Sequence, residues 1–214
     1  MSTTEATTKN KDDAARFANL IGPTDPKVDR EVREILITAR VGLLLKASFF
    51  GNLATRLKLV NADEWCPTAA TDGRNFYYNT RFIEMLRPKE IEFLFGHEVL
   101  HCVYDHFGRR GDRDPQLWNI ANDYCVNGDL VKHNVGEKIT SVPCLYDRKY
   151  DGMSSEEVYD QLYEKASPIG TEIVVSGIKL KVIGVLEKKG NMMGGGDDDY
   201  YEDDGFIERA AAKI

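Results

Sequence analysis

The chain has 214 residues and a formal net charge of -7, with 42% hydrophobic and 29% charged residues. This length and composition predict one soluble globular domain with a substantial core, with or without an appendage. Six acidic residues lie within residues 197–204, so the rest of the chain is nearly neutral. Because such a balance leaves no basic stripe, we expect no nucleic acid among the partners.

Export and membrane insertion are excluded by similar arguments. The longest apolar stretch, residues 35–50, is interrupted by Arg40 and Lys46, so no transmembrane helix is predicted. Residues 1–13 contain no apolar segment of a secretory signal. The four cysteines have no CxxC spacing, which is typical of reduced thiols. We therefore expect a cytoplasmic protein with no membrane partner.

The first half of the chain predicts two helices and a small hairpin. Apolar residues recur at helical spacing after Pro26, and the turn signal Asp72-Gly73 separates two short strand-like runs. The predicted elements are helices at 27–46 and 48–59, strands at 67–71 and 75–79, and a short helix at 80–86.

Two longer helices follow. Pro88 suits the first position of a helix, which we expect over 88–107. Asp114 followed by a proline is a second helix start and predicts a helix over 115–132. The short connection between them predicts a helical hairpin.

The remaining segments suggest a division of the chain. Ser154 and Glu157 form a capping box that opens a helix to about residue 165. Alternating residues then predict a second hairpin, with strands at 171–175 and 178–186. The expected division is a disordered tail (1–26), a main domain (27–166), a β-hairpin extension (167–190), an acidic Gly-rich linker (191–205) and the start of a truncated helix (206–214).

Three of the four histidines, His97, His101 and His106, fall within ten residues. The first two form an HExxH motif on the predicted helix 88–107. Residues four apart lie one above the other on a helix, so both imidazoles can reach one metal ion. Glu98 projects beside them, where it can hold and deprotonate a metal-bound water. The pattern predicts one zinc ion per chain, with Glu98 as the catalytic base.

Catalytic zinc takes a third protein ligand and leaves a fourth position open. Asp123 is the first candidate, because a helical hairpin would bring helix 115–132 alongside the HExxH helix. His106 is the alternative. It lies about 140° around a continuing helix from His101, so it could reach the metal only if the helix broke near Asp105.

Other polar residues are expected to orient the ligands. Asp105 follows His101 by one turn and suits a hydrogen bond to the second ring nitrogen of that histidine. Asn119 lies four residues before Asp123, and Asn127 lies four residues after it. This spacing predicts a polar face on helix 115–132.

The chain resembles the metallopeptidase domain that precedes a von Willebrand A-like domain in many bacterial and phage proteins. The matching pieces are Thr71-Asp72-Gly73-Arg74 with Tyr77-Tyr78-Asn79, Gly96 to His101, Trp118 to Asn127, and Tyr150 to Tyr159. The resemblance covers about residues 30–165 and implies peptide-bond hydrolysis. It also implies a MoxR-type AAA ATPase or a von Willebrand A-like domain as a partner.

We therefore expect an α+β, zincin-like fold, in which the HExxH helix is paired with a second ligand-bearing helix and a small antiparallel sheet. The expected function is that of a zinc-dependent metallopeptidase acting on a peptide or protein substrate. The strand with Asn75, Phe76, Tyr77, Tyr78 and Asn79 would form the sheet edge that pairs with the substrate. Arg74, Tyr77, Tyr78 and Tyr124 remain open candidates for the oxyanion donor.

The alternative is a non-catalytic module that uses a metal for stability and binds another protein, such as an AAA ATPase. Glu98 favours the enzyme. A purely structural zinc site has no use for a general base and normally closes with a fourth protein ligand.

Overall fold

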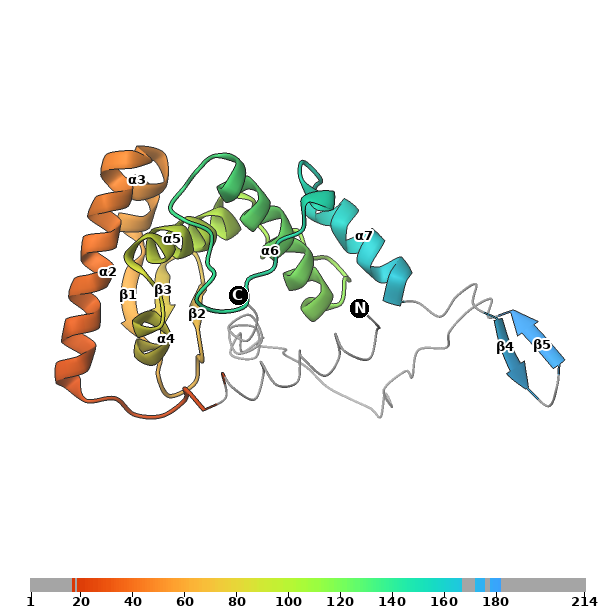
Figure 1. Cartoon of the computed structure of the whole chain (residues 1–214), viewed down its shortest axis with the longest axis horizontal. Coiled ribbons are helices and arrows are strands. Elements are labelled where there is room, and N and C mark those ends of the chain that lie inside the picture. The colour runs from red at the N-terminus through yellow and green to blue at the C-terminus, as the bar shows by residue number, and fades with distance from the viewer. Residues whose placement is uncertain (1–16, 18, 167–171, 176–177, 182–214) are drawn as a thin grey trace, which may run out of the picture.

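The computed structural model describes residues 17, 19–166, 172–175 and 178–181 (Figure 1). Its helices are α2 (Pro26–Lys46), α3 (Ser48–Arg56), α4 (Thr80–Glu84), α5 (Pro88–Val103), α6 (Pro115–Lys132) and α7 (Ser155–Ala166), with a 3-10 helix η1 (Arg148–Tyr150). Its strands are β1 (Lys58–Asn61), β2 (Ala69–Thr71), β3 (Asn75–Tyr78), β4 (Glu172–Val175) and β5 (Ile178–Lys181). The predicted α+β class is confirmed.

Several predicted segments lie outside the described residues. These are residues 1–16 and 18 of the predicted tail (1–26), the acidic linker (191–205) and the final helix (206–214). Of the extension 167–190, the structure describes β4 and β5, which pair antiparallel as the sequence predicts. In the described part of the chain, no helix is both long and apolar enough to cross a membrane.

The larger sheet is mixed, not antiparallel as expected. β3 is its central strand, paired antiparallel with β2 and parallel with β1. The β2–β3 hairpin is thus confirmed, whereas β1 was wrongly predicted as the end of helix 48–59. α3 stops at Arg56, and Leu57 already has an extended backbone, with φ -73° and ψ 125°. Because β1 is stabilised by pairing with a distant strand, local apolar spacing does not reveal it.

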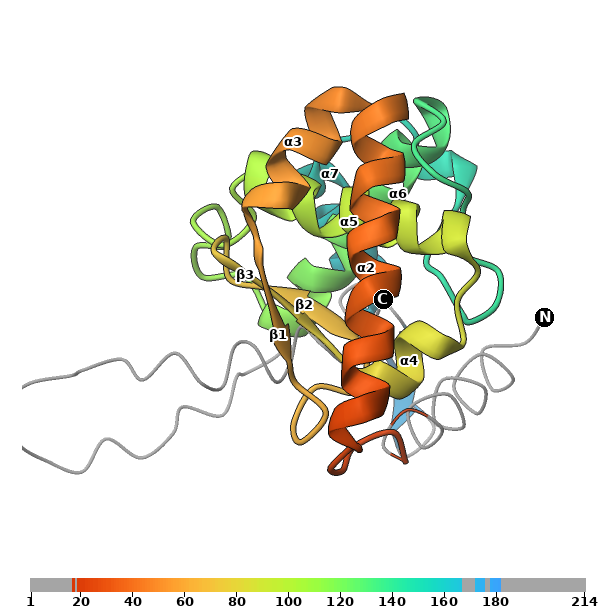
Figure 2. The same cartoon turned by 90° about the vertical axis from the view of Figure 1, so that its left-hand side faces the viewer.

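α5 lies in the middle of the helices and the sheet (Figures 1 and 2). It contacts α2, α3, α6 and β2. Its buried apolar residues join those of α2 and the sheet in the main hydrophobic core, which includes Phe76, Phe82, Phe93 and Phe95. A second core lies between α6 and α7 and contains Trp118. α6 contributes to both cores, because its residues Val126 and Leu130 belong to the main core with α5.

Local capping sets where these two helices begin. Asp114 accepts a hydrogen bond from Leu117 N at 2.8 Å and precedes the first residue of α6. α5 begins at Pro88, and the Glu90 side chain accepts from Arg87 N at 2.9 Å. Both starts agree with the prediction, because each depends on residues close together in the sequence.

α5 ends earlier than predicted, at Val103 instead of residue 107. Asp105 has a φ of 50°, its N–H donates to Cys102 O at 3.2 Å, and the His106 N–H donates to His101 O at 3.2 Å. These two bonds form a Schellman motif, whose left-handed residue is usually glycine but is aspartate here. The prediction was wrong because it relied on a glycine as the stop signal. As a result, His106 folds back toward His101.

Gly96 allows α5 and α6 to approach closely. A Cβ atom at Gly96 would lie 2.8 Å from Leu130 Cδ2 on α6 and 3.1 Å from Val135 Cγ1. Both separations are shorter than ordinary carbon–carbon contact, about 3.5–4.0 Å. His97 follows Gly96 directly, so this close approach brings the HExxH motif to α6.

Candidate metal centre

Three side chains from α5 and α6 converge on one point. His97 Nε2 and His101 Nε2 lie 2.9 Å apart, and Asp123 Oδ1 lies 3.6 Å from the former and 3.3 Å from the latter. All three residues are buried, and His101, the most exposed, is 8% exposed. The structure thus brings together the three residues that the sequence analysis placed first as ligands.

The spacing of these atoms suits a metal ion. Two ligands of tetrahedral zinc, each about 2.0–2.1 Å from the ion, lie about 3.3 Å from each other. The observed separations of 2.9, 3.3 and 3.6 Å lie on both sides of that value. A point equidistant from the three atoms lies about 1.9 Å from each of them, so an ion fits slightly above their plane. Two imidazoles and a carboxylate are also a donor set found in catalytic metal sites.

Asn127 sets the orientation of His97. Asn127 Oδ1 lies 2.8 Å from His97 Nδ1, and Asn127 Nδ2 donates to Leu145 O at 2.8 Å. Because the amide nitrogen is engaged by a carbonyl, the amide oxygen faces the ring and His97 Nδ1 is the donor. The lone pair of His97 Nε2 then points toward His101 and Asp123. This is the tautomer that a metal ligand needs.

His106 lies behind His101 and outside the group of ligand atoms. Its Nδ1 is 3.0 Å from His101 Nδ1, and its Nε2 is 3.0 Å from Ser155 Oγ at the start of α7. The expectation for Asp105 is corrected here, because the second ring nitrogen of His101 meets His106 instead. Asp105 is exposed, and its carboxylate accepts from Gly108 N at 3.3 Å. The cause is the early end of α5, which turns the chain at Asp105 and returns His106 to His101.

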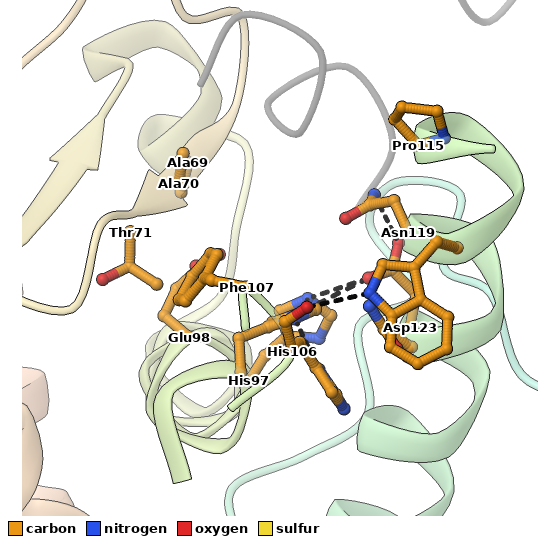
Figure 3. A pocket seen from close by; sticks show the side chains of 13 residues that line it. Ala69, Ala70, Thr71, His97, Glu98, His106, Phe107, Pro115, Asn119 and Asp123 are labelled. Carbon is orange, nitrogen blue, oxygen red and sulfur yellow. Dashed lines mark hydrogen bonds and ion pairs between the residues drawn. The ribbon is translucent and has the colours of Figure 1, made fainter. Parts of the chain in front are cut away.

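The ligand residues line a pocket between three elements (Figure 3). β2 forms one wall, α6 forms the opposite wall, and His97, Glu98 and His101 of α5 lie between them. Figure 3 shows Glu98 on the side of β2, while Asp123 projects from α6 toward His97. Glu98 is 4% exposed. The pocket therefore brings the HExxH glutamate and the ligand residues together around one space.

The charges in this pocket favour a cation. Burial, and after it the negative charge of Asp123, raises the pKa of Glu98 to about 8. Burial lowers the pKa of both His97 and His101 to about 4, so both rings are neutral near pH 7. No lysine or arginine is among the described residues that line the pocket. A divalent cation would compensate the carboxylates and lower the pKa of Glu98 toward the range of a base.

Asn122 is a pocket residue that the sequence analysis did not single out. It is 2% exposed, and its Oδ1 atom has no hydrogen-bond partner among the described residues. Asn119 also lines the pocket, and its Nδ2 donates to Asp123 Oδ2 at 3.4 Å. Residues 119, 122 and 123 are spaced i, i+3, i+4, which places them on one face of α6. That spacing is the signal that could have identified Asn122.

The predicted substrate strand, Asn75 to Asn79, does not border the pocket. Its core is β3, whose two edges are already paired with β1 and β2. β2 is the strand that lines the pocket, so the expected edge is corrected from residues 75–79 to Ala69–Thr71. The prediction was wrong because β1 was not expected as a strand. β1 pairs with the edge of β3 that faces away from β2, so β3 has no free edge. None of the open candidates for the oxyanion donor lines the pocket, namely Arg74, Tyr77, Tyr78 and Tyr124.

A family model described as "Putative metallopeptidase domain" matches residues 33–210. The chain belongs to this family. The resemblance seen in the sequence is thereby confirmed, and the matched region contains all the residues of the candidate metal centre. No curated protein and no solved structure matched the chain. The family description supports a metal-dependent peptidase, and His97, His101 and Asp123 are the residues that could hold its metal.

Proposed function

We propose that the protein is a zinc-dependent peptidase of zincin-like architecture. His97, His101 and Asp123 hold one zinc ion, and Glu98 is the general base and acid. The observation that carries the proposal is the convergence of two histidine nitrogens and a carboxylate oxygen within 3.6 Å of one another, in the same pocket as Glu98. The family match supports it independently.

Zinc in this position would supply Lewis acidity, which activates water and polarises a carbonyl group. The side chains of the protein supply the proton transfer and the ligand atoms. Glu98 accepts a proton from the attacking water and donates it to the amine that leaves. The neutral rings of His97 and His101 leave their Nε2 lone pairs available, because burial disfavours the imidazolium form. The buried position of Glu98 excludes bulk water from the proton transfer.

The pocket walls indicate how a peptide would lie. β2 pairs with β3 on one side, and in the described residues no strand pairs with its other side. An extended peptide could add there as a further strand, with backbone hydrogen bonds that do not depend on its sequence. On the opposite wall, Asn122 Oδ1 lacks a partner in the described residues and could accept a hydrogen bond from a peptide N–H. Both features suit a polypeptide backbone as the substrate.

The test is Glu98→Gln, which removes the ionisable group and preserves the shape of the side chain. We expect the variant to keep zinc and to lose about 10²–10⁴-fold in cleavage of an unfolded, fluorescently labelled protein. Glu84→Gln is the matched control, because Glu84 is exposed and does not line the pocket. This control should cleave at the wild-type rate.

Two results would contradict the proposal. Cleavage by Glu98→Gln at the wild-type rate would mean that another group, or another protein, performs the reaction. A zinc-loaded wild type that cleaves no peptide in a diverse library would favour a metal-stabilised binding module. In that case an AAA ATPase or a von Willebrand A-like domain would be the first partner to examine.

A further inference from the structure

We propose that His106 is a positioning residue of the metal centre, which accepts a hydrogen bond from His101 Nδ1 and so keeps the lone pair of His101 Nε2 directed at the metal. The inference rests on the proposed metal centre. It adds a residue that lies outside both the HExxH motif and the ligand set.

The position of the His106 ring is determined on several sides. The residue is 2% exposed, and its Nδ1 and Nε2 atoms each lie 3.0 Å from a polar atom, on His101 and Ser155 respectively. Trp118 Nε1 donates to His106 O at 2.8 Å, and the Trp118 ring lies edge-on with its centroid 6.1 Å away. The Tyr104 ring lies 5.6 Å away, centroid to centroid. Such packing leaves the ring little freedom to rotate.

The contact between His101 and His106 requires one hydrogen atom. Two ring nitrogens 3.0 Å apart form a hydrogen bond when one carries a proton and the other a lone pair. If His101 Nδ1 carries the proton, the lone pair of His101 is on Nε2, beside His97 and Asp123. If His106 Nδ1 carries it, His101 holds its proton on Nε2, where it blocks a metal ion. The pair therefore decides whether His101 can act as a ligand.

Ser155 allows the pair to adopt the arrangement that a metal needs. A hydroxyl group can either donate or accept, so Ser155 Oγ accepts from His106 Nε2–H as readily as it donates to a bare nitrogen. When His106 carries its proton on Nε2, its Nδ1 is free to accept from His101. Ser155 is the first residue of α7. The relay thus connects the metal centre to the helix that packs against α6.

The two histidine ligands are held by different means. Asn127 can only accept from His97, because its amide nitrogen is committed to Leu145 O. His97 Nε2 therefore bears a lone pair, which lies 2.9 Å from His101 Nε2. His101 can serve as a ligand only with its proton on Nδ1 and the His106 proton on Nε2. This arrangement and the alternative one carry the same number of protons on the two rings.

Paired substitutions of His106 test this role. Asn retains an oxygen acceptor near the position of Nδ1, whereas Leu fills a similar volume and has no acceptor. We expect His106→Leu to weaken zinc binding by about 10–100-fold, measured by competition with a chromophoric chelator, and His106→Asn to stay close to wild type. The unfolding midpoint of each zinc-free variant is the second readout, because a merely structural role would lower it in parallel with the affinity. Ser155→Ala should weaken zinc binding less than His106→Leu, since it removes only the far end of the relay.

The outcomes separate this role from the metal centre itself. Equal zinc affinities for wild type and His106→Leu would overturn the role of His106 and leave the metal centre intact. A wild type that binds no zinc would overturn the metal centre, and the role of His106 with it. If the Leu variant does not fold, nitrogen-15 NMR of the zinc-loaded wild type decides. Protons on His101 Nδ1 and His106 Nε2 support the proposal, and a proton on His106 Nδ1 overturns it.

Discussion

At the scale of single residues, the candidate metal centre is a set of buried polar groups whose partners are also buried. Asn127 is fully buried, and each end of its amide group is within 2.8 Å of a partner. A buried polar atom that loses its partner costs free energy, so such a network holds each member in one orientation. The orientation of His97 therefore depends on Asn127, and through Asn127 on the backbone at Leu145.

We expect Asn127→Leu to weaken zinc binding by about 10–100-fold, because His97 loses the acceptor for its Nδ1–H. The same variant should lower the free energy of unfolding of the zinc-free protein by about 1–3 kcal/mol, since Leu145 O and His97 Nδ1 lose their partner. Asn127→Asp keeps an oxygen acceptor for His97 and should retain zinc more tightly than Asn127→Leu. Chelator competition and urea unfolding measure the two effects, and an Asn127→Leu variant with wild-type zinc affinity would contradict this account.

At the scale of elements, the HExxH helix is positioned at both ends. Its first turn holds the loop that follows α6, since Glu90 accepts hydrogen bonds from Thr140 N at 2.7 Å and Ser141 N at 3.0 Å. Its last turn closes in the Schellman motif that returns His106 to His101. Between these ends, Gly96 lets α6 come close. The metal ligands on α5 thus depend on contacts made by α5 along its whole length.

Sequence reasoning predicted the parts of this arrangement that depend on neighbouring residues. The helix starts, the β2–β3 hairpin and the face shared by His97 and His101 all follow from local signals. β1 was missed because it is defined by pairing with β3. The end of α5 was misplaced because Asp105 takes the left-handed conformation that glycine usually adopts. Asp105 was therefore assigned the contact with His101 that His106 makes.

The contacts of Glu90 predict an acid sensitivity of the fold. Burial raises the pKa of Glu90, but the hydrogen bonds from Arg87, Ser141 and Thr140 lower it far more, so it ends well below its ordinary value. A depressed pKa contributes stability above the ordinary glutamate pKa of about 4.3, and this stability is lost as the pH falls below that value.

We therefore expect the wild type to lose up to about 1.4 kcal/mol of unfolding free energy per pH unit through this one group below about pH 4.3. Glu90→Gln should be less stable than wild type at pH 6 and should show a flatter pH profile. Urea unfolding at pH 6, 5, 4 and 3 gives both profiles. Parallel profiles for the two proteins would show that Glu90 does not contribute in this way.

At the scale of the whole molecule, the candidate centre lies where two hydrophobic cores meet. α5 belongs to the core built on α2 and the sheet, and the core that contains Trp118 lies between α6 and α7. α6 contributes residues to both cores. His97 and His101 come from α5, Asp123 comes from α6, and Ser155 is the first residue of α7. A metal held by His97 and His101 of α5 and by Asp123 of α6 would join these two helices. Metal binding should therefore also stabilise the fold, by about 2.7 kcal/mol at a free metal concentration of 100 times Kd.

The metal centre is tested most directly by the zinc content per chain of folded protein, measured by plasma mass spectrometry after purification without chelators or metal affinity columns. Wild type should carry one zinc per chain, and Asp123→Ala should carry none while keeping the circular dichroism spectrum of the wild type. Asp105→Asn is the control and should keep its zinc, because Asp105 is exposed and bonds Gly108. A folded wild type without zinc, or a folded Asp123→Ala that retains it, would contradict a centre built from His97, His101 and Asp123.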